Sequence, residues 1–260
     1  MLQAGKHPGK INLTDVDNGI NILQYLTKKT ACVILKHNNP CGAAWSDNGI
    51  LDALTKAYFS DRIAAFGGSV VTNSPINKEA AEFINKYYFE VIAAPEYEEG
   101  TLDILSRRKN LRILKIQGLA NLDKLINEPF LDIKSLVDGG MILQFSFRSK
   151  ILSPEDFLPA EATKDGDRII ARRPTEKEFQ DLVFAWAVEA GVTSNSVLFA
   201  KDGATVAIGT GEQDRVGCVD LTIHKAYVKY ADRLTYEKTG LSFYELRQKA
   251  RSDKKTLRDP

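Results

Sequence analysis

An adjacent lysine and histidine, Lys36 and His37, open a polar segment that follows the apolar run of residues 31–35. A short apolar run of this kind is typical of a buried strand, and ligands in open α/β sheets bind at the carboxyl ends of strands. A histidine placed there can act as a general base near neutral pH, and the ammonium group beside it can stabilise developing negative charge. The alternative is a surface turn with incidental charges, which is the more common outcome for such a pair considered alone.

The same segment carries part of a zinc-deaminase pattern, in which His-x-Glu is followed by Pro-Cys-x-x-Cys. His37 and Cys41 match that pattern, but Asn39 stands at the glutamate position and Ala44 at the second cysteine position. An amide cannot shuttle protons, and a methyl group cannot bind a metal. We therefore expect no zinc here, and we interpret Cys41 as a packed or half-exposed thiol.

Three further segments could contribute polar groups to a site. Asn12 precedes an expected helix, residues 193–196 place four hydrogen-bonding side chains at a strand entrance, and residues 209–215 form a glycine-containing loop before a helical segment. That loop could bind an anion through its backbone N–H groups. Helix capping and ordinary turns explain the same residues, so both interpretations stay open from the residues alone.

The elements that must position these groups alternate between helices and short apolar strands, which predicts the α/β class. Thr-Glu-Lys-Glu at residues 175–178 is typical of a capping box, and Asp-Gly at residues 202–203 favours a tight turn between strands. We expect helices over residues 16–27, 50–58, 78–88, from 175 onward, 221–230 and 244–250, and strands over residues 31–35, 69–71, 91–94, 111–116, within 134–145, 196–200 and 205–208. Residues 156–167 are expected to form a loop.

A weak internal similarity suggests two related lobes. The apolar strand and turn that begin at residue 31 resemble the strand and turn at residues 195–201. We divide the chain on this basis into a first lobe of residues 1–150, which holds the Lys-His pair, and a second lobe of residues 151–260.

Composition narrows the class of partner. The 260 residues carry 35 basic and 34 acidic side chains, a net charge of +1, so nucleic acid and acidic membranes are not expected as partners. The chain has three cysteines, a small and odd number that argues against a disulfide framework and suits a reducing compartment. No apolar stretch reaches bilayer length and the first ten residues lack a secretory pattern, so a cytoplasmic location is expected.

Taken together, the polar segments resemble the family of aminoimidazole carboxamide ribotide (AICAR) transformylases, and the resemblance covers nearly the whole chain. The matching segments, in family order, are residues 11–13 (Ile-Asn-Leu), 35–44 (Leu-Lys-His-Asn-Asn-Pro-Cys-Gly-Ala-Ala), 65–68 (Ala-Phe-Gly-Gly), 91–95 (Val-Ile-Ala-Ala-Pro), 108–110 (Arg-Lys-Asn), 194–197 (Ser-Asn-Ser-Val), and 201–203 with 208–216. The resemblance implies a fold of two cytidine-deaminase-like, three-layer α/β lobes. It also implies formyl transfer from 10-formyltetrahydrofolate, a cosubstrate, to the 5-amino group of AICAR.

The resemblance assigns roles to individual residues. Lys36 and His37 match the catalytic pair of the family, with His37 as the base on the amine and Lys36 as the cation for the oxyanion or the leaving nitrogen. Asn195 matches an asparagine near the reacting centre. The residues that match substrate-binding positions are Asn12, Phe66, Gly67, Glu90, Arg215 and Val216. We predict that Lys36, His37 and Asn195 face one pocket.

The resemblance also implies a homodimer with the site at its interface. Family members carry an upstream Arg-Tyr-Gly-x-Asn-Pro segment and a downstream Phe-Phe-Pro-Phe-Arg-Asp segment near the site, and neither is in these 260 residues. We therefore expect the catalytic groups to be present and part of the substrate cradle to be missing. The alternative function is a shortened or degenerate, non-catalytic relative that binds a nucleotide or folate.

Overall fold

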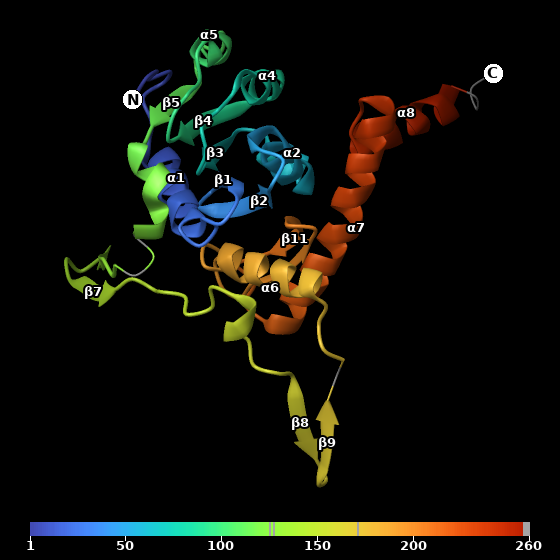
Figure 1. The fold of residues 1–260 in the computed structure, drawn as a ribbon. Helices are drawn as coiled ribbons and strands as arrows, with labels where there is room; N and C mark the ends of the chain where they lie inside the picture. Colours follow the sequence, from blue (N-terminus) through green and yellow to red (C-terminus); the bar gives the residue numbers. More distant parts are fainter. Residues whose placement is uncertain (125, 127, 171, 257–260) are drawn as a thin grey trace.

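A seven-stranded mixed sheet forms the middle layer of the computed structural model, which describes residues 1–256 except 125, 127 and 171 (Figure 1). The strand order is β10-β11-β2-β1-β3-β4-β5. β3, β4 and β5 are parallel, and the other neighbouring pairs are antiparallel. The strands are β1 (Thr30–Lys36), β2 (Asn39–Ser46), β3 (Gly68–Thr72), β4 (Phe89–Ala94), β5 (Arg112–Lys115), β10 (Val197–Lys201) and β11 (Ala204–Gly209).

One face of the sheet is covered by α1 (Lys10–Leu23) and α6 (Glu176–Glu189). Their apolar side chains form a single cluster with β1 and β3 that includes Val16, Leu35, Val71 and Phe184. At Gly19 a Cβ atom would lie 2.6 Å from the side chain of Val71, so only glycine lets α1 approach the sheet this closely.

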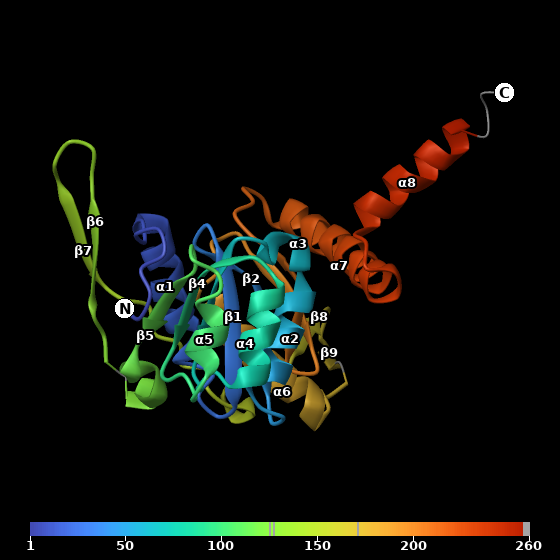
Figure 2. The same cartoon turned by 90° about the horizontal axis from the view of Figure 1, so that it is seen from above.

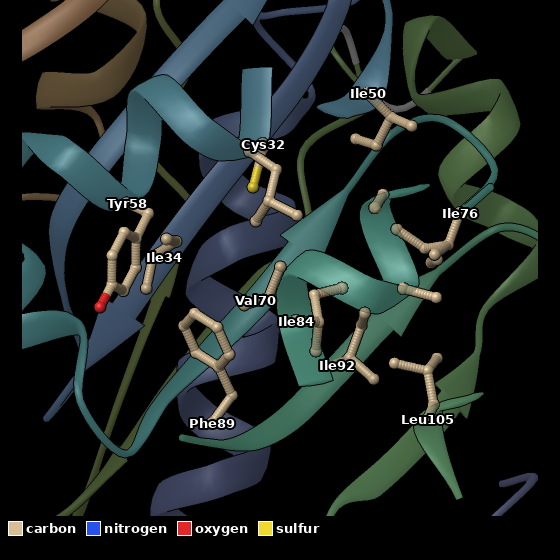
Figure 3. Packing of buried hydrophobic residues seen from close by; sticks show 14 of the residues in the cluster. Cys32, Ile34, Ile50, Tyr58, Val70, Ile76, Ile84, Phe89, Ile92 and Leu105 are labelled. Carbon is tan, nitrogen blue, oxygen red and sulfur yellow. The ribbon is translucent and has the colours of Figure 1, made fainter. Parts of the chain in front are cut away.

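The opposite face is covered by α2 (Ile50–Ser60), α4 (Lys78–Lys86) and α5 (Thr101–Leu105). Figure 3 shows this second core, in which Cys32 and Ile34 of β1 point away from α1 and toward Tyr58 and Ile84. β1 is buried on both sides because alternate side chains enter the two clusters. Helices on both faces of one sheet confirm the expected three-layer α/β class.

The long helix α7 (Arg215–Thr239) lies beside α2 and β11 and is followed by α8 (Phe243–Thr256). Two ion pairs connect α7 to the residues at and after the end of α2: Asp232 lies 2.8 Å from Arg62 Nε, and Lys229 Nζ lies 2.9 Å from Asp61. The Arg62 guanidinium also stacks 4.0 Å from the ring of Tyr236. Arg62 begins the short helix α3 (Arg62–Ala65), so these contacts fix α7 to the corner between α2 and α3.

Two hairpins and α8 project from the layers (Figures 1 and 2). The hairpins are β6 (Leu131–Ser135) with β7 (Met141–Phe145), and β8 (Glu161–Lys164) with β9 (Asp167–Ile170). Two short 3₁₀ segments accompany them in the sequence: η1 (Gln117–Lys124) precedes the first hairpin, and η2 (Pro154–Asp156) lies between the two. None of the described helices combines the length and the apolar character that a bilayer crossing requires.

Several sequence expectations need correction. α1 begins at Lys10 rather than at residue 16, and α7 runs from Arg215 to Thr239 rather than from 221 to 230. Residues 156–167, expected as a loop, include β8 and the first residue of β9. The polar segment after β1 is not a long turn, because β2 starts at Asn39 and is buried for most of its length. Asn, Pro and Gly are weak strand formers, and pairing with β1 overrides that preference.

β10 and β11 extend the same sheet as β1–β5, through a pairing of Ala204 with Ala44 of β2. The expected capping box of α6 is present, with Thr175 and Glu178 bonded to each other's backbone N–H groups. The division into lobes near residue 150 stays a prediction.

Candidate active site

A cavity of about 790 Å³ lies between the first turns of α1 and one edge of the sheet. Six of the predicted site residues line it: Asn12, Lys36, His37, Phe66, Gly67 and Glu90. They come from α1, the end of β1, the start of β3, and β4. The rule that sites lie at carboxyl ends of strands holds here only for β1, because β1 is antiparallel to β3 and the parallel strands β3–β5 begin at this edge.

His37 lies at the tip of the β1–β2 hairpin. Lys36 pairs with Asn39, so His37 and Asn38 alone form the turn. Their φ angles are 56° and 61°, as in the type I′ turns that match the twist of a two-residue hairpin. A left-handed conformation costs a residue other than glycine roughly 1–2 kcal/mol, so contacts from the rest of the fold must hold this turn. The result is an exposed imidazole at the mouth of the cavity.

Lys36 reaches across the sheet edge to the segment before β3. Its Nζ donates a hydrogen bond of 2.6 Å to the carbonyl oxygen of Phe66. Gly67 follows with a φ of 73°, and its N–H donates to Tyr88 across 2.8 Å. The Phe66 and Tyr88 rings lie 4.9 Å apart, so the wall beside the ammonium group is aromatic and partly exposed. An ammonium group has three donors, and one is already used by Phe66.

Glu90 forms the acidic wall of the cavity. Its carboxylate accepts hydrogen bonds from Asn12 Nδ2 at 3.2 Å and from Arg112 at 3.4 Å. Arg112 is almost buried, and its Nε donates to the carbonyl of Lys6 at 2.6 Å. Glu90 is therefore held from two sides while its other surface faces the cavity.

Asp15 also lines the cavity, although sequence reasoning did not select it. Its side chain is buried, and burial raises the pKa of its carboxyl group, against the opposing effects of hydrogen bonds from the Asn38 N–H and the Ser69 hydroxyl. The available signal was a carboxylate on the apolar face of α1, directly before Val16. Arg112 was missed as well, because a single arginine in a strand pattern has no distinctive spacing.

The other three predicted residues lie outside this cavity. Asn195 donates hydrogen bonds of 3.1 Å to the carbonyls of Glu212 and Gln213, so it joins the loops before β10 and α7. Arg215 is the first residue of α7, and the Val216 side chain is 72% exposed. Within the described part of a single chain, the structure thus brings Asn195 close to the Arg215 segment but does not line the His37 cavity with it.

The two groups are connected through Asn39. Its Oδ1 accepts hydrogen bonds from the Thr193 N–H at 3.0 Å and from the Thr210 hydroxyl at 2.9 Å. Asn39 follows the His37 turn, and Thr193 precedes Asn195 by two residues. That Asn195 faces His37 across a second copy of the chain stays a prediction.

Comparison with known proteins identifies the family of this chain. The model of the family described as "AICARFT/IMPCHase bienzyme" matches residues 1–225. The chain belongs to that family. Relatives named bifunctional purine biosynthesis protein PurH are 40% identical over 222 residues in Caldicellulosiruptor saccharolyticus and 35% identical over 222 residues in Aquifex aeolicus.

Each of these two alignments covers 85% of this family member and 40% of the relative. The chain thus spans well under half the length of the PurH proteins that it matches. Among solved structures, a dCMP deaminase from the cyanophage S-TIM5 aligns with 42% of this chain and 100% of its own, at 9% identity and a TM-score of 0.33. A likeness this distant has no bearing on activity.

The cysteine of the zinc-like pattern is packed in this family member. Cys41 Sγ lies 3.4 Å from the carbonyl oxygen of Ile34, and burial, followed by the charge of Asp61, raises its pKa to about 12. This packing agrees with the interpretation of Cys41 as a packed or half-exposed thiol. Among residues 1–256, apart from those not described, no group of three or more His, Cys, Asp or Glu side chains could hold a metal. The expected absence of zinc stays a prediction for metal analysis.

Proposed function

We propose that this chain carries the formyl-transfer chemistry of purine biosynthesis, passing the formyl group of 10-formyltetrahydrofolate to the 5-amino group of AICAR. The observation that carries the proposal is the single cavity that Asn12, Lys36, His37, Phe66, Gly67 and Glu90 share, although they come from segments up to 78 residues apart. The family match and the names of the PurH relatives support it.

The amine of AICAR is a weak nucleophile because its lone pair is delocalised, so the reaction needs a base, positioning and oxyanion stabilisation. In the proposed step, the amine nitrogen bonds to the formyl carbon while His37 removes an amine proton. The bond from that carbon to the folate N10 then breaks, and N10 takes a proton. Lys36 would stabilise the formyl oxyanion or help to protonate N10, with the donors that Phe66 leaves free.

The cavity walls suit the two substrates in this proposal. Glu90, held by Asn12 and Arg112, offers a carboxylate to the N–H donors of a pterin ring. Phe66 and Tyr88 offer aromatic surface. Asn195, Arg215 and Val216 would complete the site from a second copy of the chain, as the family resemblance implies. We accordingly propose a homodimer that acts in the cytoplasm and needs neither nucleic acid nor membrane.

The decisive experiment is steady-state kinetics with AICAR and 10-formyltetrahydrofolate. It compares the 260 residues with the same residues inside a chain of the relatives' length. We expect transfer in the longer chain and much weaker transfer in the 260 residues, because positioning can supply roughly 7–11 kcal/mol of barrier reduction. Equal rates would show that these residues alone build the site.

The matched histidine variants assign the base. His37→Ala should lower kcat by about 10²–10⁴-fold, whereas His224→Ala, an exposed histidine on α7, should leave it unchanged. Activity that survives His37→Ala would refute the assignment of the base. Binding of AICAR or folate without transfer, in both chain lengths, would instead support the non-catalytic alternative.

A further inference from the structure

The His37–Asn38 turn is held by two side chains on one face of α1. Asp15 Oδ1 accepts a hydrogen bond of 2.6 Å from the Asn38 N–H, and Asn18 Nδ2 donates one of 2.9 Å to the Asn38 carbonyl oxygen. Asp15 and Asn18 are three residues apart in a helix, so they lie side by side. Both backbone polar groups of Asn38 are thereby bonded to the same helix.

Each of the two holding residues is itself fixed by the fold. The second oxygen of Asp15 accepts from the Ser69 hydroxyl of β3 at 3.2 Å, and Asp15 is 3% exposed. Asn18 also donates to the Gly191 carbonyl, just after α6, at 2.8 Å. Each holding side chain is therefore bonded to a second element of the fold, whereas the turn that it contacts is exposed.

We infer that Asp15 and Asn18 are positioning residues, which clamp Asn38 so that the left-handed turn aims His37 into the cavity. The inference rests on the proposed function, in which His37 is the base. The clamp explains how a histidine and an asparagine keep φ angles of 56° and 61° without glycine. It also connects the turn to the loop of Asn195, because Gly191 and Thr193 lie in one short segment between α6 and β10.

Asn18 gives the sharper test, since it does not line the cavity and contacts the His37–Asn38 turn through the Asn38 carbonyl oxygen. Its second bond, to the Gly191 carbonyl, joins α1 to the segment after α6. Asn21 is its matched control: it lies one turn later on α1 and donates to the Ala190 carbonyl at 3.1 Å, but it does not touch the turn. Asn18→Ala and Asn21→Ala should lower the melting temperature alike. Only Asn18→Ala should lower kcat, by about 100-fold, with little change in the KM for AICAR, because misplacing a reacting group by about 1 Å has that effect.

Asp15 is tested by rescue. Asp15→Asn keeps an oxygen for the Asn38 N–H and a polar group for Ser69, so it should retain most of kcat, whereas Asp15→Ala should lose it. Asp17→Ala, an exposed aspartate of the same helix, is the control for removing a charge. Equal kcat in Asn18→Ala and Asn21→Ala, or equal losses in Asp15→Asn and Asp15→Ala, would overturn the clamp.

Amide hydrogen exchange of Asn38, followed by NMR in the 260-residue chain, separates failure of the clamp from failure of the proposed function. Exchange should be about tenfold faster or more in Asp15→Ala, the equivalent of one lost charge-assisted hydrogen bond, and unchanged in Asn21→Ala. If no variant or chain length transfers formyl groups but this pattern is found, the clamp stands and the proposed chemistry does not. Unchanged exchange in Asp15→Ala overturns the clamp whatever the activity.

Discussion

At the scale of single residues, the site combines a solvent-exposed titratable side chain with a buried one. His37 is exposed at the tip of a hairpin, whereas Asp15, directly behind it, is buried. Burial disfavours the charged form of a carboxyl group, and the hydrogen bonds from Asn38 and Ser69 offset that effect only in part. Wherever the pH is high enough to ionise this buried carboxyl group, its charge lowers the stability of the folded state.

This balance predicts a pH-dependent effect of Asp15→Asn on stability. A carboxyl group whose pKa is raised on folding stabilises the folded state below its unfolded pKa, near 3.8, and loses that contribution as pH rises through the folded pKa. An amide keeps the two contacts without a buried charge. We expect Asp15→Asn to unfold at higher urea concentration than the unmodified chain at pH 7.5, with the advantage shrinking toward pH 4. Asp17→Asn is the control, and a lower urea midpoint for Asp15→Asn at pH 7.5 would contradict the prediction.

Cys41 allows a second residue-scale prediction. With its pKa raised to about 12, only about one part in ten thousand is thiolate at pH 8. Cys32 is fully buried, and burial raises its pKa as well. We expect both thiols to react slowly with a thiol reagent in the folded chain and at once after unfolding in guanidinium. Rapid labelling of Cys41 in the folded state, or stoichiometric zinc in elemental analysis, would show that this thiol is more accessible than its packing indicates.

At the scale of elements, the close contact between β2 and α2 decides whether the hairpin that carries His37 can form. A Cβ at Gly42 would lie 2.0 Å from the carbonyl oxygen of Ala57. That oxygen belongs to the backbone of α2, so it cannot move aside without moving the helix. The glycine in the Pro-Cys-Gly sequence is therefore a packing requirement.

Gly42→Ala should consequently destabilise the chain by about 1–3 kcal/mol, the usual cost of overpacking. Gly118→Ala is a suitable control, because nothing lies within 4 Å of the added Cβ at that exposed position. Urea unfolding of both variants gives the comparison. If Gly42→Ala unfolds at the same urea concentration as Gly118→Ala, β2 and α2 do not approach as closely as described.

At the scale of the whole molecule, the β6–β7 hairpin has one apolar face and projects from the layers (Figure 2). Ile133 pairs with Leu143. The pairs two residues away on either side, Leu131 with Phe145 and Ser135 with Met141, lie on the same face, because alternate residues of a strand share a face. The apolar residues of this face, which are 59–72% exposed, are Leu131, Ile133, Met141, Leu143 and Phe145. A two-stranded hairpin is only marginally stable alone, so a covered face is expected.

We predict that a second copy of the chain covers this face. We predict that the 260-residue chain sediments as a dimer and that Ile133→Lys with Leu143→Glu, which keeps a cross-strand pair, shifts it toward monomer by at least about tenfold in dissociation constant. Lys134→Glu, on the opposite face of the hairpin, should leave the dimer intact. A monomer at tens of micromolar would contradict the prediction for this chain.

The sequence by itself determined the α/β class and most of the strands, and it singled out Asn12, Lys36 and His37, which line the cavity. These depend on local patterns: apolar runs for β1 and β4, the capping box of α6, and polar residues that directly follow or precede those runs. The resemblance carried by the polar segments named the family, which the family match confirms. The roles that it implies for individual residues stay predictions. Such features survive in a linear pattern because each involves residues within a few positions of one another.

Only the tertiary structure decided how distant segments meet. It turned Asn39–Ser46, which opens with the weak strand formers Asn39 and Pro40 and contains Gly42, into a buried strand, because pairing with β1 and packing against α2 outweigh local preference. It placed Asp15 and Arg112 in the cavity, and it put Asn195 beside the loop that leads into α7, outside the cavity. Strand order and the register of long-range contacts set these positions, and the spacing of residues along the chain predicts neither of them.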